Sequence, residues 1–184
     1  MLIRFNDIFT DEYLTRAQEL EMTIDDVVTL ASIIEKEAKT ADFAKVSAVF
    51  HNRLAQDMRL ESDAPLRYIF KTEGVLDFTA EQMQSDSPYN TYTHDGLPVG
   101  PIGNPGDQAI QAALWPDEEY VEDGYLYFVL KSRTSTELVF STDYDDFLEN
   151  KEAYQASPTA TPEGPAEGEA EPTATPDSTP TPEE

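Results

Sequence analysis

The chain has 184 residues, and its 37 acidic and 12 basic side chains give it a formal net charge of −25. Nucleic acid is therefore not an expected partner, because binding to phosphates requires a basic face. The sequence contains no cysteine and only two histidines, His51 and His94, so disulfides and thiolate metal sites are excluded. We expect neither a metal ion nor another cofactor.

The start of the chain has helical periodicity. Residues 1–20 carry charges every few positions, which indicates an amphipathic helix rather than a signal peptide or a membrane span. Apolar side chains recur every three or four positions over residues 23–38, after a start signal formed by Thr23 and two aspartates that follow it. The same spacing predicts a second helix over residues 41–56.

The middle of the chain is less regular. Alternating polarity over residues 58–65 predicts a short extended piece that Pro65 stops, and residues 77–85 are expected to form a short helical turn. Residues 87–106 contain four prolines and four glycines, too many for regular structure. Long ordered loops of this kind are often functional.

The last part of the folded region returns to regular elements. Helical spacing covers residues 106–115, and Pro116 is expected to end that helix. Aromatic and β-branched runs at residues 124–130 and 137–141 predict a β-hairpin, and residues 144–154 a closing helix. Helices first and strands later indicate an α+β fold: one mixed domain with N-terminal helices, a long ordered Pro/Gly-rich loop, and a C-terminal hairpin plus helix.

The end of the chain differs in composition from the rest. Residues 157–184 contain 7 of the 13 prolines and 7 acidic residues, but no aromatic residue, Leu, Ile, Val, Lys or Arg. Such a segment cannot bury a core. We therefore expect one folded domain over residues 1–156 and a disordered acidic Pro/Thr-rich tail over residues 157–184.

Two glutamates lie near the end of the apolar helix predicted over residues 23–38. At about 100° per residue, Glu37 falls inside the apolar arc, whereas Glu35 lies near its edge. A desolvated glutamate has a raised pKa, so it holds a proton near neutral pH and can donate it to a leaving oxygen. Glu37 is therefore expected to be the more desolvated of the two, and spacing alone leaves open the alternative that it is solvated or ion-paired.

The loop over residues 87–106 has side chains suited to sugars. Aromatic rings stack on pyranose faces, while amides and hydroxyls bond to the polar edges. The candidate ligand contacts in this loop are Tyr89, Asn90, Thr91, Tyr92 and Asn104. The alternative is a surface loop that the prolines hold in shape, with its tyrosines covering the edge of the core.

A set of segments, taken in order, resembles the catalytic domain of the YceG-like endolytic murein transglycosylases, the MltG family. The segments are LASIIEKEA, VFHNRL, MRLESD, SPYNTY, GLPVGPIGNPG, AAL and YLYFV, between residues 30 and 129. The resemblance implies a lytic transglycosylase that cleaves the bond between N-acetylmuramic acid and N-acetylglucosamine in peptidoglycan without water. Its product would be a 1,6-anhydro-muramoyl end, and its role the termination or trimming of nascent glycan strands.

The resemblance also implies roles for residues. It places the catalytic glutamate in the segment 35–37 and favours Glu37, with Glu35 as the alternative. A single carboxyl group then acts first as acid and afterwards as base, unlike the paired acids of ordinary glycosidases. Ser62 and Asp63 join the loop residues as implied substrate contacts. The implied location is extracytoplasmic, in the cell envelope, with cell-wall synthases of the elongation machinery as further partners.

This chain departs from the family pattern in several places. Relatives commonly have Asp-Pro-Thr at positions 63–65 and a Gly-Gly-His segment at positions 135–138, where this chain has Asp-Ala-Pro and Ser-Thr-Glu-Leu. The missing histidine weakens the expectation of substrate contacts near the hairpin. Relatives also carry an N-terminal membrane helix and a LysM-like subdomain, so we expect an N-terminally truncated form of a membrane-anchored protein. A non-catalytic peptidoglycan-binding or scaffold module is the alternative function.

Overall fold

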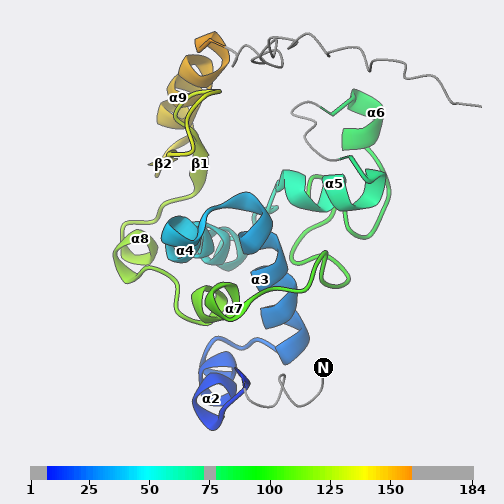
Figure 1. Ribbon diagram of the computed structural model, residues 1–184, viewed down its shortest axis with the longest axis vertical. Coiled ribbons are helices and arrows are strands. Elements are labelled where there is room, and N and C mark those ends of the chain that lie inside the picture. Colours follow the sequence, from blue (N-terminus) through cyan, green and yellow to red (C-terminus); the bar gives the residue numbers. More distant parts are fainter. Residues whose placement is uncertain (1–7, 73–77, 159–184) are drawn as a thin grey trace, which may run out of the picture.

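Helix α3 (Ile24–Glu37) lies at the centre of the fold. The structure is a computed structural model and describes residues 8–72 and 78–158. A 3₁₀ turn at Thr40–Asp42 follows α3. The helices that pack against α3 come from both halves of the chain (Figure 1): α2 (Asp11–Glu19), α4 (Phe43–Ala55), α5 (Asp63–Phe70) and α7 (Asp107–Leu114).

The start and the buried face of α3 follow the sequence pattern. The hydroxyl of Thr23 accepts a hydrogen bond from the Asp26 amide at 3.1 Å, and the Asp26 carboxylate accepts one from the Thr23 amide at 2.9 Å. This reciprocal cap confirms the predicted start of the helix. Leu30, Ile33 and Ile34 are fully buried. Each such side chain contributes about 1.5–3 kcal/mol through removal of its apolar surface from water.

Pro65 lies inside a helix, which corrects one prediction. Helix α5 begins at Asp63, and Ser62 is its N-cap residue. Proline is tolerated in a first helical turn because its missing N–H would have no acceptor within the helix there. The prediction that residues 58–65 form an extended piece stopped by proline is therefore wrong at its C-terminal end.

The loop region and the helices beside it agree with the sequence. Helix α6 (Ala80–Met83) lies within the short turn predicted over residues 77–85, of which Asp77 is outside the described residues. Residues 87–106 form turns without a helix or strand, as predicted, and α7 follows them. Helix α8 (Glu118–Glu122) was not predicted, because one and a half turns are too short to show a clear apolar period.

The chain returns as a hairpin that is followed by a helix. Strands β1 (Tyr127–Leu130) and β2 (Leu138–Ser141) pair antiparallel, with Phe128 opposite Phe140. Helix α9 (Tyr144–Ala156) packs against both strands. Mixed helices with this small sheet confirm the α+β fold class.

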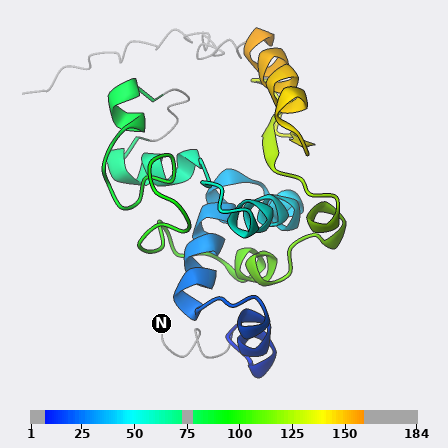
Figure 2. The ribbon, with the colours of Figure 1, turned by 180° about the vertical axis from the view of Figure 1, so that it is seen from behind.

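Two arms project from the helical body. Figures 1 and 2 show α5 and α6 on one side and the hairpin with α9 on the other, both at the end of the molecule away from α2. Phe128 of β1 lies edge-on to Phe50 of α4, with ring centroids 5.9 Å apart. This contact attaches the hairpin arm to the body.

The two ends of the chain are described only in part. Helix α2 begins at Asp11, later than the helix predicted over residues 1–20, and residues 1–7 lie outside the described residues. The tail predicted over residues 157–184 also lies outside them, apart from its first two positions. Across the described ranges, each helix is too short or too polar to span a membrane.

Candidate active site

A cleft of about 600 Å³ lies between the two arms. The C-terminal part of α3 and side chains of α4 form its base, the α5 side forms one wall, and the hairpin with α9 forms the other. Its lining includes side chains of both charges: Lys36, Glu37, Arg53, Glu61, Asp63, Arg67, Arg133 and Lys151. A concave site with convergent polar groups and perturbed carboxyls is where chemistry is expected.

Glu37 is the last residue of α3 and extends into this cleft. Its Oε1 accepts hydrogen bonds from the Ser62 hydroxyl and from the Ala64 amide, the latter at 3.0 Å. Burial raises the pKa of Glu37, although these two bonds and the charge of Arg67 act in the opposite direction. Because both bonds end on Oε1, Oε2 is the oxygen left to carry a proton toward a ligand.

Ser62 is held in place by the long loop. Its backbone amide donates to the Thr91 hydroxyl at 3.0 Å, and that hydroxyl donates to the Ser62 carbonyl at 3.2 Å. The Glu61 amide donates to the Thr91 carbonyl at 3.1 Å. These bonds fix the start of α5, so that its first-turn amide at Ala64 and its capping hydroxyl both meet Glu37.

Asn90 and Thr91 are placed behind the cleft wall. Their exposed fractions are 0% and 1%, so neither presents surface to a ligand in this conformation. Asn90 instead donates to the carbonyls of Met83 at 3.0 Å and Ser85 at 2.8 Å, and accepts from the Tyr92 amide at 3.0 Å. Ligand contacts were predicted here from the polarity of these side chains. Polarity alone does not show that a side chain already forms its hydrogen bonds with nearby backbone groups.

Tyr92 and Asp63 line the cleft together. The Tyr92 hydroxyl donates to Asp63 Oδ1 at 2.7 Å, and Arg67 Nη2 lies 3.5 Å from Asp63 Oδ2. Burial first, and then the negative charge of Asp63, raise the pKa of Tyr92. The phenol therefore stays protonated, and Asp63 is fixed in one orientation beside Glu37.

The remaining two loop candidates lie away from this cleft lining. Tyr89 is partly buried and its ring packs against that of Tyr68, with centroids 5.1 Å apart. Asn104 is exposed two residues before Gly106, the N-cap residue of α7. Neither belongs to the described lining around Glu37.

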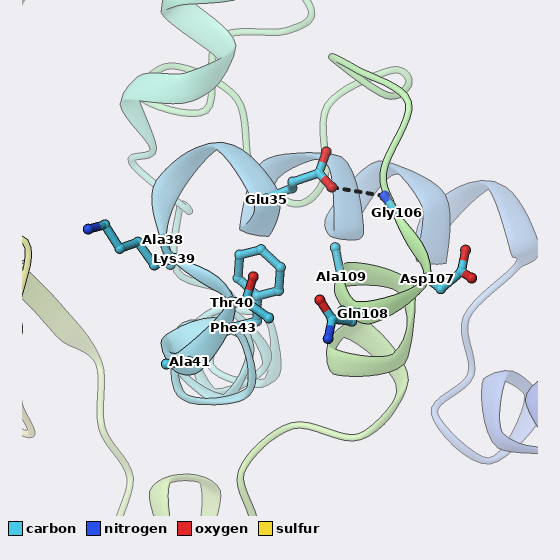
Figure 3. Close-up of a pocket in the computed structure, with 10 residues that line it drawn as sticks. All are labelled: Glu35, Ala38, Lys39, Thr40, Ala41, Phe43, Gly106, Asp107, Gln108 and Ala109. Atoms are coloured by element: carbon cyan, nitrogen blue, oxygen red, sulfur yellow. Dashed lines mark hydrogen bonds between the residues drawn. The ribbon is translucent and has the colours of Figure 1, made fainter.

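Glu35 points to a different depression of the surface. Its Oε1 accepts a hydrogen bond from the Gly106 amide at 2.9 Å, which ties α3 to the start of α7. Figure 3 shows this carboxylate at the edge of a pocket of about 810 Å³ that Phe43 and Ala109 also line. The two glutamates of the segment therefore face separate cavities, and of the two only Glu37 lines the cleft with Ser62 and Asp63.

Arg53 supports the cleft from below. It is 7% exposed, and its guanidinium donates to the carbonyls of Leu126 at 2.7 Å, Arg59 at 2.9 Å and Leu60 at 3.1 Å. It also reaches Glu61 at 3.2 Å. Arg53 thus joins α4 to the segment before α5 and to the start of the hairpin, the two walls of the cleft.

A sequence model of the YceG-like family matches residues 1–153. The chain belongs to the YceG-like family. This confirms the family that the sequence motifs indicated.

Relatives of this YceG-like chain share its sequence over most of the folded part. A protein of Bacillus subtilis (strain 168) named endolytic murein transglycosylase is 35% identical over 159 residues, which are 85% of this chain and 42% of that protein. A protein of the same name from Streptococcus pneumoniae is 33% identical over 122 residues, 64% of this chain and 21% of that protein. The chain spans less than half the length of these relatives.

A solved structure has the same fold. The crystal structure of a yceG-like protein from Listeria monocytogenes superposes with a TM-score of 0.67 and 34% identity, over 80% of this chain and 45% of that one.

Sequence reasoning about this YceG-like chain missed the cleft wall formed by the hairpin and α9. Arg133 follows β1, and Lys151 and Tyr154 lie on α9. A usable signal was present: Phe147, Lys151 and Tyr154 recur at spacings of four and three, which puts an aromatic and basic face on a helix that is otherwise acidic.

Proposed function

We propose that this chain is the catalytic domain of an endolytic peptidoglycan lytic transglycosylase. It cleaves the glycosidic bond between N-acetylmuramic acid and N-acetylglucosamine and leaves a 1,6-anhydro-muramoyl end. The observation that carries the proposal is the position of Glu37: a carboxyl with a raised pKa, in a cleft, with one oxygen fixed by two donors. The names of the relatives support the same activity.

Glu37 performs both proton transfers in this mechanism. Its protonated Oε2 gives a proton to the glycosidic oxygen, and the bond from that oxygen to muramoyl C1 breaks. The resulting carboxylate then removes the proton of the muramoyl C6 hydroxyl while O6 bonds to C1. The acid is regenerated, and no water is consumed.

The neighbours of Glu37 suit this cycle. Between the two steps the carboxylate is charged, and the Ser62 hydroxyl and the Ala64 amide stabilise it at the positive end of α5. The carboxylate of the partly buried Asp63, which Tyr92 orients, is proposed to stabilise the positive charge that develops on the sugar ring. Ser62, Asp63 and Tyr92 are thus the proposed contacts of the reacting sugar, and Asn90 with Thr91 position them.

The catalytic domain proposed here covers residues 1–156. Tyr89 and Asn104, at the rim of the loop, are left as contacts for sugars further along the strand. Because peptidoglycan lies outside the cytoplasmic membrane, the proposed activity places the site of action in the cell envelope.

Paired variants test the assignment of the acid. Purified chain is incubated with uncrosslinked glycan strands, and released fragments are separated and identified by mass spectrometry. Wild type and Glu35→Gln are expected to give the same anhydro-ended fragments, and Glu37→Gln none. Activity of Glu37→Gln together with loss in Glu35→Gln would show that the acid is Glu35. Binding of strands by wild type with no fragments would instead support a non-catalytic module.

A further inference from the structure

The hairpin wall of the cleft carries positive charge that the mechanism does not use. The chain has 12 basic residues and a net charge of −25, and five of the basic residues that the structure describes line the cleft. Arg53 is occupied by carbonyls and Glu61, and Arg67 pairs with Asp63. Lys36, Arg133 and Lys151 remain. Lys36 lies on α3 next to Glu37, whereas Arg133 and Lys151 line the opposite wall.

Arg133 and Lys151 are held in place without being neutralised. Arg133 lies over the ring of Tyr154, 5.4 Å from its centroid, and Lys151 Nζ lies 5.7 Å from the centroid of Phe147. Among the described residues neither has a carboxylate within 4.0 Å, and the buried Nε of Arg133 has no acceptor. Aromatic rings orient a cation but leave its charge available to a ligand.

We infer that Arg133 and Lys151 bind a carboxylate of the peptide that muramic acid carries, so that the substrate is a peptide-bearing strand. This inference rests on the proposed function. The peptide begins on the muramoyl ring whose bond Glu37 would cleave, and its acidic and C-terminal residues supply carboxylates. A peptide that crosses the cleft from that ring brings them to the opposite wall, where Arg133 and Lys151 lie. A guanidinium and an ammonium are the usual partners of such groups.

A small anion fits this wall better than a polyanion. The chain as a whole is strongly acidic and repels a phosphate polymer at long range. Two cations inside a cleft of about 600 Å³ act only over the few ångströms that a group attached to the bound sugar can reach. The charge distribution therefore favours a carboxylate delivered by the substrate itself.

Binding measured without turnover tests the inference directly. The Glu37→Gln chain is titrated calorimetrically with a soluble peptide-bearing muropeptide, and with the same muropeptide after its carboxyls are converted to methylamides. Loss of a charge-assisted contact is expected to weaken binding roughly tenfold. In a chain that also carries Arg133→Gln and Lys151→Gln, the two ligands are expected to bind equally.

Lys131→Gln is the matched control, since this exposed hairpin lysine pairs with Glu137 at 2.8 Å and is not in the cleft lining. It is expected to keep the tenfold ratio. Equal binding of both muropeptides to the Glu37→Gln chain, or an unchanged ratio after Arg133→Gln and Lys151→Gln, would overturn the inference. The proposed function is tested apart from this, because its failure would appear as absent cleavage by wild type on intact strands.

Discussion

Replacing Ser62 by alanine separates the chemistry of Glu37 from the stability of the fold. The substitution removes a hydroxyl that donates to Glu37 and also caps α5. The cap contributes little to stability here, because the Ala64 amide lies 3.3 Å from the Ser62 hydroxyl but 3.0 Å from Glu37 Oε1. After the substitution this amide keeps Glu37 as its acceptor. We expect a stability loss near the low end for a lost cap, about 0.5 kcal/mol, measured by urea unfolding.

The effect of Ser62→Ala on catalysis is a shift in pH dependence. The hydroxyl bond favours the ionised carboxylate, so its loss raises the pKa of Glu37 further. Because the acid must be protonated to act, the fall of kcat/KM on the alkaline side is expected to move to higher pH. Ser62→Gly should move the alkaline limb in the same direction while the helix cap stays almost intact. Ser47→Ala should leave the limb unmoved, because Ser47 is a buried serine whose hydroxyl has no partner among the described residues. An unmoved alkaline limb in Ser62→Ala, or one moved to lower pH, would refute this role.

Three further outcomes follow from the same contacts. Glu35→Ala removes the tie to Gly106 and is expected to lower the free energy of unfolding by about 1 kcal/mol in urea while glycan cleavage continues; lost cleavage at full stability would contradict this. Arg53→Met leaves buried carbonyls without a donor, so urea unfolding should show a loss of roughly 3 kcal/mol, and a change below about 1 kcal/mol would contradict the bracing role. Glu37→Gln is expected to stabilise the chain relative to wild type as pH rises. The raised pKa of Glu37 means that the unfolded state ionises first, above pH 4.5, so wild type loses stability from there up to the folded pKa. Unfolding curves at a series of pH values with a constant difference would contradict this sign.

The parts of the fold that could be predicted are those that depend on residues close together in the sequence. Thr23 and Asp26 form the cap that their spacing indicated, and α7 lies within the helix predicted over residues 106–115. Helix α5 was missed because Pro65 was taken as a stop, whereas a first turn accommodates it. The local sequence shows that a proline is present, but it does not show where a helix cap lies relative to that proline. Here the cap residue, Ser62, is held by Thr91, which lies far along the chain.

The candidate site could be predicted only on one of its sides. The helical spacing of about 100° per residue separated Glu37 from Glu35, and in the structure the two side chains line separate cavities. Asn90 was expected to contact the ligand, but its amide group donates to backbone carbonyls. These bonds depend on how the loop closes. Arg133 and Lys151 reach the cleft because Phe128 and the bond from Arg53 to the Leu126 carbonyl hold the hairpin against α4. No local period reveals such contacts between distant segments.

Glu37 is proposed to close the muramoyl C6 hydroxyl onto C1 without water. Digestion of glycan strands by the wild-type chain in water enriched with ¹⁸O, followed by mass spectrometry of the new muramoyl ends, tests it most directly. The expected result is anhydro ends that carry no ¹⁸O, all absent with Glu37→Gln. Reducing ends that carry one ¹⁸O atom would show hydrolysis and contradict the claim.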